Sequence, residues 1–149
     1  MLSDRFGRSV DYLRISVTDR CDLRCSYCIP KGFKGFEEPA NWLTFDEIER
    51  VIAAFARLGT RRYRLTGGEP LLRRHLPQLA ARLAALPGVD DLSLTTNGTQ
   101  LASQAEALHA AGVRRLNVSL DSLRDDCVHD ITGSRNLDQV LAGLRAAVR

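Results

Sequence analysis

The chain alternates strand-like and helix-like segments four times, and this order limits the folds open to it. Four strand-like runs are predicted, each followed by a helix pattern: Tyr12–Val17, Arg62–Leu65, Asp91–Thr95 and Arg115–Leu120. Strands separated by helices lie parallel, because each helix returns the chain to the end of the sheet where the next strand starts. The sequence therefore predicts an α/β fold with parallel strands, either as an open sheet or as a barrel.

Four helices are predicted from apolar periodicity and end signals. The first begins with a capping box, Thr44-x-x-Glu47, and the third carries a similar signature, Ser103-x-x-Glu106, and ends at Gly112. The second helix is expected to stop at Pro87-Gly88, and the fourth to begin near Asn136. The side chains expected on buried faces are Ile48, Val51, Ile52 and Phe55, then Leu76, Leu79, Leu83 and Leu86, and finally Leu137, Val140, Leu141 and Leu144.

Polar and apolar residues alternate along every predicted strand. Parallel strands that are buried on both faces read instead as nearly continuous apolar runs. The apolar faces can pack under the helices, so the polar faces must turn toward a wet interior. That interior differs from the Val, Ile and Leu layers that fill a packed barrel. We therefore favour an incomplete, open barrel with a polar lumen; the alternative is a one-sided sheet with a solvated face. The residues expected on the polar faces are Arg14, Ser16, Thr18, Arg62, Arg64, Thr66, Ser93, Thr95, Asn97, Asn117, Ser119 and Asp121.

Three cysteines follow the first predicted strand in the order Cys21-x3-Cys25-x2-Cys28. Thiolates ligate iron–sulfur clusters, and three of them leave one iron of a four-iron cluster open to a small molecule. Three clustered cysteines cannot all form disulfides with one another. A zinc site would need a fourth ligand, and no His or Cys follows Cys28 before His75. The pattern favours a [4Fe-4S] cluster. The alternatives are a zinc site and cysteines that only pack against other side chains.

Hydrogen-bonding residues follow the other strands, at the edge where barrel enzymes carry their chemistry. The second strand leads into Thr66-Gly67-Gly68-Glu69-Pro70, whose glycines allow a ligand to approach the backbone closely. The third strand ends in Thr95-Thr96-Asn97-Gly98, and the fourth continues into Ser119-Leu120-Asp121. These loops are expected to form the rim of a ligand-binding cavity.

Composition indicates a single globular body. The chain has 149 residues, 44% of them hydrophobic, and a net charge of +3 that indicates neither a nucleic-acid nor a membrane partner. No apolar run approaches the roughly 18 residues of a membrane span. The first residues lack the apolar core of a signal peptide. We therefore expect a cytoplasmic location, which suits an oxygen-sensitive cluster.

Two motifs resemble those of radical S-adenosylmethionine (SAM) enzymes: the cysteine loop with Tyr27 before its last cysteine, and Gly67-Gly68-Glu69-Pro70. Further segments make the resemblance more specific. From Phe6 to Arg149 the chain resembles the molybdenum cofactor biosynthesis protein A family, the GTP 3′,8-cyclases. Those segments are Leu13 to Cys21, Tyr27-Cys28-Ile29-Pro30, Arg64 to Pro70, Thr95 to Gly98, Asn117–Leu123 and Ile131-Thr132-Gly133.

The resemblance implies the fold of a radical SAM barrel, its cofactors and a set of site residues. Cys21, Cys25 and Cys28 would hold the [4Fe-4S] cluster. S-adenosyl-L-methionine would contact Tyr27, Gly68 and Ser119, and GTP would contact Arg14, Arg64 and Thr95. No side chain is expected to act as a nucleophile or other catalytic residue.

The implied reaction makes (8S)-3′,8-cyclo-7,8-dihydroguanosine 5′-triphosphate from GTP. Reductive cleavage of S-adenosylmethionine gives a 5′-deoxyadenosyl radical, which takes the 3′ hydrogen of GTP before the ribose bonds to carbon 8 of guanine. The implied partners are GTP and a reductant protein, and a homodimer is considered for a full-length form.

The chain departs from the family pattern in length. It holds about four of the family's six βα units, and the family's second cluster lies in a C-terminal extension that residues 1–149 do not include. We expect an incomplete radical SAM core domain that does not cyclise GTP by itself. Cys127, the only spare cysteine, is expected to be a structural thiol. The alternatives are another radical SAM enzyme, such as a peptide or cofactor maturase, and a non-catalytic cluster- and SAM-binding module.

Overall fold

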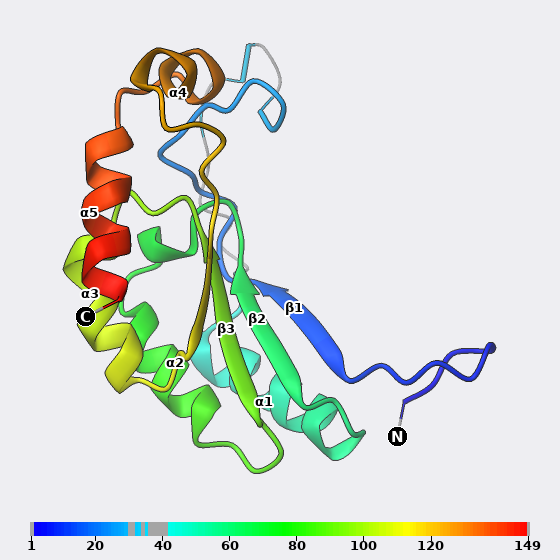
Figure 1. Cartoon of the computed structure of the whole chain (residues 1–149). Helices are drawn as coiled ribbons and strands as arrows, with labels where there is room; N and C mark the ends of the chain where they lie inside the picture. Colours follow the sequence, from blue (N-terminus) through cyan, green and yellow to red (C-terminus); the bar gives the residue numbers. More distant parts are fainter. Residues whose placement is uncertain (1, 30–31, 34, 36–41, 149) are drawn as a thin grey trace.

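Four parallel strands form a single sheet in the order β1-β2-β3-β4 (Figure 1). The computed structural model describes residues 2–29, 32–33, 35 and 42–148. Pro30, the last residue of the Tyr27-Cys28-Ile29-Pro30 segment, therefore lies outside the described residues. The strands are β1 (Tyr12–Ser16), β2 (Arg62–Thr66), β3 (Asp91–Thr96) and β4 (Arg115–Val118). The predicted parallel α/β fold is confirmed, with strand boundaries that differ by one or two residues.

The helices are α1 (Phe45–Arg57), α2 (Leu76–Ala84), α3 (Leu101–Ala110), α4 (Asp125–Thr132) and α5 (Leu137–Ala147), with a short 3-10 turn η1 (Pro70–Leu72). Figure 1 shows α1, α2, α3 and α5 on one side of the sheet, and α4 beyond the end of the strands. The helix α4 was not predicted. Of its side chains only Val128 and Thr132 are buried, so its apolar stripe is short.

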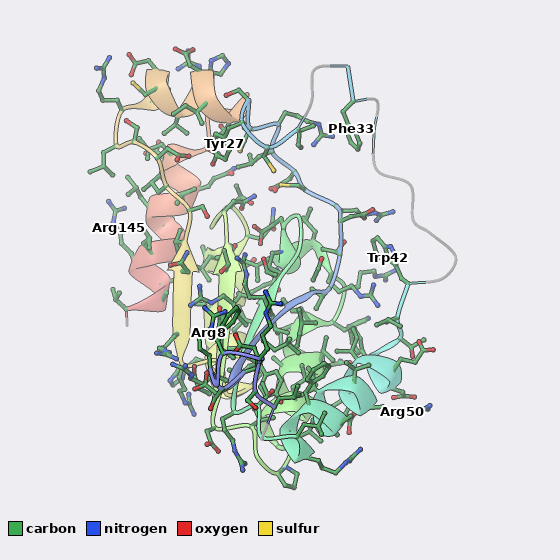
Figure 2. All side chains as sticks on the ribbon, turned by 90° about the vertical axis from the view of Figure 1, so that its right-hand side faces the viewer. Arg8, Tyr27, Phe33, Trp42, Arg50 and Arg145 are labelled. Carbon is green, nitrogen blue, oxygen red and sulfur yellow. The ribbon has the colours of Figure 1, made fainter. Side chains whose placement is uncertain are left out.

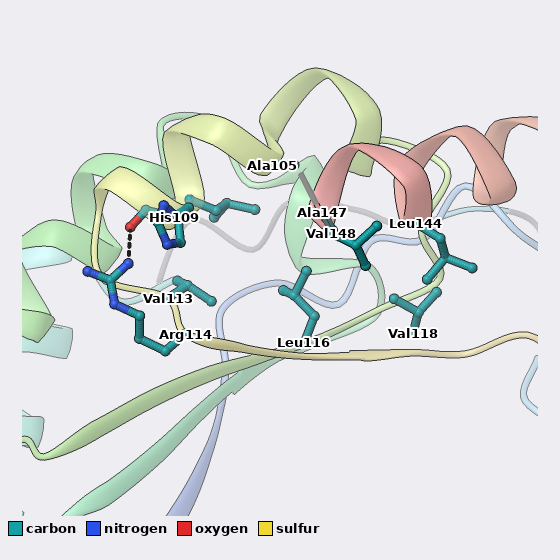
Figure 3. A pocket seen from close by; sticks show the side chains of 10 residues that line it. Ala105, His109, Val113, Arg114, Leu116, Val118, Leu144, Ala147 and Val148 are labelled. Carbon is teal, nitrogen blue, oxygen red and sulfur yellow. Dashed lines mark hydrogen bonds between the residues drawn. The ribbon is translucent and has the colours of Figure 1, made fainter.

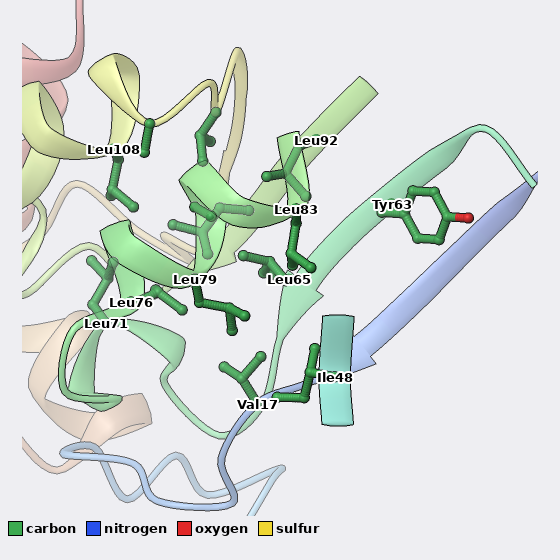
Figure 4. Packing of buried hydrophobic residues seen from close by; sticks show 14 of the residues in the cluster. Val17, Ile48, Tyr63, Leu65, Leu71, Leu76, Leu79, Leu83, Leu92 and Leu108 are labelled. Atoms are coloured by element: carbon green, nitrogen blue, oxygen red, sulfur yellow. The ribbon is translucent and has the colours of Figure 1, made fainter. Parts of the chain in front are cut away.

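The strand register confirms that the sheet has one apolar and one polar face. Ile15, Leu65, Leu94 and Leu116 lie side by side across the four strands and form an apolar row. Tyr63, Leu65 and Leu94 are fully buried under the helices. Figure 4 shows Leu76, Leu79 and Leu83 of α2 packed in this core with Leu65. The apolar face therefore joins the sheet to the helices, and the polar face points the other way.

Three details of the prediction are wrong. Val51 was expected to be buried, but it is 42% exposed, since the buried stripe of α1 runs through Ile48, Ile52 and Ala56. The Ser103 signature is not a capping box: α3 begins earlier, at the buried Leu101, and the Ser103 hydroxyl donates to the Gln100 carbonyl. Thr18 was placed on the polar face, but β1 ends at Ser16 and Thr18 is buried.

The Thr44 capping box is confirmed, and we expect its removal to destabilise the protein. The Thr44 hydroxyl accepts from the Glu47 amide, and the Glu47 carboxylate accepts from the Thr44 amide at 2.8 Å. Thr44→Ala should lower the free energy of unfolding by about 1 kcal/mol. The matched control, Ser103→Ala, should cost less than about 0.5 kcal/mol because Ser103 caps no amide. Urea unfolding of both variants checks this, and equal losses would contradict it.

No helix within the described ranges is long and apolar enough to cross a membrane.

Candidate functional site

The cysteine loop, Cys21 to Cys28, follows β1 and lies against the end of α4 (Figure 1). Two backbone hydrogen bonds fix it there: the Arg24 amide donates to the Thr132 carbonyl at 2.9 Å, and the Ser26 amide to the Ile131 carbonyl at 2.8 Å. These carbonyls belong to the Ile131-Thr132-Gly133 segment singled out in the sequence. The segment therefore acts as a support for the loop that carries the cysteines.

The Gly67-Gly68-Glu69 loop packs against the chain just before Cys21. The Gly68 amide donates to the Thr18 carbonyl at 2.8 Å, and the Glu69 amide to the Arg20 carbonyl at 2.6 Å. A Cβ at Gly68 would lie 2.3 Å from the Arg20 carbonyl oxygen, and one at Gly67 would lie 2.3 Å from the Thr18 carbonyl oxygen. The two glycines are thus required for the approach of this protein's own backbone.

The Glu69 carboxylate is buried behind the rim and joins two loops. It accepts from the Thr96 hydroxyl at 2.7 Å, the Asn97 amide at 2.6 Å and the Leu71 amide at 3.0 Å. Burial raises the pKa of Glu69, and these three donors oppose that rise. Glu69 therefore holds the end of β3 in place, and its carboxylate is buried rather than exposed to a ligand at the rim.

All three loop cysteines are free thiols. Desolvation raises the pKa of Cys21 and of Cys25. Among the described residues, no three ligating side chains converge tightly enough for a single metal ion. A cluster of several irons places its thiolates on different irons, so three free thiols on one loop fit that group.

Tyr27 connects the cysteine loop to the chain after β4. Its hydroxyl donates to the Asp121 carboxylate at 3.2 Å. Partial desolvation and the nearby charges of Cys25 and Asp121 raise the pKa of Tyr27 to about 12, so the hydroxyl remains a donor at neutral pH. Figure 2 shows Tyr27 at the same end of the molecule as α4. Of the expected SAM contacts, Tyr27 and Ser119 thus belong to segments that meet, since Ser119 lies two residues before Asp121.

Two arginines lie next to each other on the polar face. Arg14 pairs with Arg64 across β1 and β2, and neighbouring strands are only ~4.8 Å apart. The Arg64 guanidinium donates to the Ser93 hydroxyl at 3.3 Å and lies over the Tyr12 ring. In the part of the chain that the structure describes, no carboxylate pairs with either arginine.

Other arginines on the same sheet do have carboxylate partners. Arg62 binds both oxygens of Asp11, at 2.9 and 3.0 Å, and Arg115 binds Asp91. Like charges placed side by side destabilise a sheet. Among the described residues, Arg14 and Arg64 thus lie side by side without the carboxylate partner that Arg62 and Arg115 have.

Thr95 lies on the same face, paired with Asn117 of β4. Its hydroxyl is buried and has no hydrogen-bond partner among the described residues. Unsatisfied buried polar atoms are rare in folded proteins and call for an explanation. A ligand on the polar face would supply the missing partner.

A groove of about 390 Å³ lies elsewhere, between α3, α5 and β4 (Figure 3). It is lined largely by apolar side chains, among them Leu108, Val113, Leu116, Val118 and Leu144. None of the expected site residues lines it. The candidate site is instead the polar face together with the loops at the strand ends.

Residues 15–149 match the family model described as the radical SAM superfamily. Curated relatives named GTP 3′,8-cyclase include one from Ectopseudomonas mendocina, 52% identical over 146 residues, and one from Pelotomaculum thermopropionicum, 48% identical over 147 residues. These matches cover 98% and 99% of this chain but 44% and 45% of the relatives. The chain thus spans less than half the length of the curated relatives it matches.

Solved structures give the same architecture. SuiB of Streptococcus suis bound to S-adenosylmethionine superposes with a TM-score of 0.70 at 25% identity, covering 89% of this chain and 30% of that one. BtrN in complex with AdoMet and 2-DOIA superposes with a TM-score of 0.57 at 18% identity, over 89% of this chain and 55% of that one. The second likeness is one of fold alone.

Proposed function

Because the chain belongs to the radical SAM superfamily, we propose that it forms the N-terminal part of a GTP 3′,8-cyclase. Members of this superfamily use a [4Fe-4S] cluster and S-adenosylmethionine. The four parallel strands with their helices form part of the barrel expected for such an enzyme. The substrate GTP and the product, the 3′,8-cyclised nucleotide of molybdenum cofactor biosynthesis, are proposed from the names of the relatives and from the polar face.

The observation that carries the proposal is the Arg14–Arg64 pair without carboxylate partners among the described residues. Guanidinium groups bind phosphate oxygens through paired, charge-assisted hydrogen bonds. A triphosphate would neutralise both charges. Thr95, with its orphaned hydroxyl, lies on the same face and would contact the same nucleotide.

Cys21, Cys25 and Cys28 would hold the cluster. Tyr27, Gly68 and Ser119 would contact S-adenosylmethionine. When bound, the cluster and S-adenosylmethionine together supply a radical that removes a hydrogen atom from the ribose of GTP. The chain's own residues would hold the triphosphate against the sheet and fix the Gly67-Gly68-Glu69 loop through Gly68 and Glu69.

Arg64→Ala tests the substrate assignment. We expect GTP to bind the reconstituted protein more weakly by roughly 1.5–3 kcal/mol, the cost of losing a hydrogen bond to a charged group. Arg62→Ala is the matched control, since Arg62 lies on the same strand and face but is paired with Asp11. Its GTP affinity should stay within about 0.5 kcal/mol of the parent.

Anaerobic calorimetry measures both affinities, and S-adenosylmethionine binding should barely change in either variant. Equal GTP affinities for the two variants would contradict the assignment. So would an Arg64→Ala protein that unfolds more easily while its GTP affinity is kept, because Arg64 would then be a structural residue.

Another radical SAM chemistry is the second candidate, since SuiB, whose fold this chain shares, was also solved bound to its precursor peptide SuiA. A peptide has no triphosphate for Arg14 and Arg64 to bind, so the calorimetry separates the two. A non-catalytic cluster- and SAM-binding module is the third, and cofactor cleavage under reducing conditions would exclude it.

A reductant protein would deliver the electron, and a cytoplasmic location would protect the cluster. The four strands of the described sheet would enclose only part of a lumen, so a polypeptide of these 149 residues is expected to cleave S-adenosylmethionine at most and not to form the cyclised nucleotide. Mass spectrometry of both products after anaerobic incubation with GTP distinguishes cleavage from cyclisation.

A further inference from the structure

Asn97 lies in the loop after β3 and contacts the cysteine loop through its side chain. Its Nδ2 donates to the Asp22 carboxylate at 2.7 Å and reaches the Cys21 Sγ at 3.9 Å, a long N–H···S contact. These residues are far apart in the sequence, and the parallel sheet brings their loops together at one edge.

The orientation of the Asn97 amide follows from its partners. A backbone N–H can only donate, and the Thr99 amide donates to the Asn97 Oδ1 at 3.0 Å. The opposite end must then be the NH₂ group, which agrees with its acceptors, the Asp22 carboxylate and the Cys21 sulfur. The Thr99 hydroxyl lies 2.9 Å from Asn97 Oδ1 and 2.6 Å from the Asp22 carboxylate and donates its one proton to one or the other of these acceptors. The side chain is therefore held on both sides.

Asn97 is also tied to the Gly67-Gly68-Glu69 loop, because its backbone amide donates to the Glu69 carboxylate at 2.6 Å. A single residue thus connects the loop that carries the cysteines with the loop expected to contact the cofactor. Hydrogen bonds to ligand sulfur are one means by which a protein sets the reduction potential of an iron–sulfur cluster.

Building on the function proposed above, we propose that Asn97 is a positioning residue that donates to the Cys21 sulfur and raises the reduction potential of the bound cluster. Reduction adds negative charge, which spreads to the sulfur ligands. An N–H donor therefore stabilises the reduced cluster more than the oxidised one. No nucleotide contact is needed for this role.

Asn97→Leu tests the proposal, because leucine has a similar size and no donor. Thr99→Val is the matched control: it removes the hydroxyl that contacts Asp22 and Asn97 Oδ1, but it keeps the Thr99 backbone amide that donates to Asn97 Oδ1 and the Asn97 amide group beside Cys21. Midpoint potentials are measured on the reconstituted holo-protein by redox titration followed by electron paramagnetic resonance. We expect a more negative midpoint in Asn97→Leu, up to a tenfold change in the reduction equilibrium, or about 59 mV for one electron. Thr99→Val should stay near the parent.

An unchanged midpoint in Asn97→Leu, or an equal shift in both variants, would overturn the proposal. If the Asn97→Leu protein holds no cluster, the contact between Asn97 and the cluster is tested instead in the parent protein labelled with ¹⁵N-asparagine. Electron–nuclear double resonance should then show a ¹⁵N coupling to the reduced cluster, and its absence would overturn the proposal. A parent protein that assembles no cluster overturns both this inference and the proposed function, whereas a cluster with an insensitive potential overturns the inference alone.

Discussion

We expect Cys25→Ser to abolish cluster assembly and Cys127→Ser to leave the iron content of the protein unchanged. Cys25 lies in the loop between Cys21 and Cys28, and a serine hydroxyl is a poor ligand for iron because it is not ionised at neutral pH. Cys127 lies in α4 and is, like Cys25, partly exposed, so the pair compares ligation with the general effect of removing a thiol. Iron and sulfide are measured per chain after anaerobic reconstitution.

The opposite pattern would contradict the ligand assignment. If Cys127→Ser lost as much iron as Cys25→Ser, Cys127 would have to be counted among the ligands. A protein that took up zinc in place of iron and sulfide would support the zinc alternative left open by the sequence.

Gly68→Ala is expected to disrupt both the fold near the site and cluster assembly. The added methyl would lie 2.3 Å from the Arg20 carbonyl oxygen and 2.4 Å from the Asp19 carbonyl oxygen. Both atoms are backbone, so no side chain can turn away to make room. The two loops must separate and lose the hydrogen bonds between them, at a cost of about 2–4 kcal/mol.

Gly133→Ala is the control, because it lies beside the cysteine loop but has room for a methyl. The nearest atom is the Arg24 Cβ at 3.6 Å, and only the positive φ of 72° is strained. We expect a loss of about 1–2 kcal/mol with the cluster retained. Urea unfolding measures the loss of stability in both variants, and iron analysis measures how much cluster each one holds. Equal losses in the two would show that the contact at Gly68 does not matter.

The sheet and its two faces could be predicted because alternation is a local property. Leu65 and Arg64 are neighbours in the sequence and must point to opposite sides of a strand. Knowing that the strands are parallel was then enough to place Arg14 and Arg64 on one face. The cysteine ligands could be proposed because they lie within a single loop.

The start of α3 and the contacts between the loops of the candidate site depend on segments far apart in the sequence, so no local sequence pattern predicts them. Ser103-x-x-Glu106 carries a capping signature inside a helix, and the burial of Leu101 decides that the helix starts earlier. The Tyr27–Asp121 and Asn97–Cys21 contacts join residues 94 and 76 positions apart. The sequence predicts that polar residues at the ends of β3 and β4 lie at the rim, but the contacts of these residues can be identified only in the folded structure.

The most direct test of the account is Mössbauer spectroscopy of the ⁵⁷Fe-reconstituted protein with and without S-adenosylmethionine. Three cysteines in one loop leave one iron of a [4Fe-4S] cluster without a protein ligand, and the cofactor would bind there. We predict a four-iron cluster in which the signal of one iron changes when the cofactor is added, while the others keep theirs. A cluster in which no iron responds to S-adenosylmethionine would contradict the account.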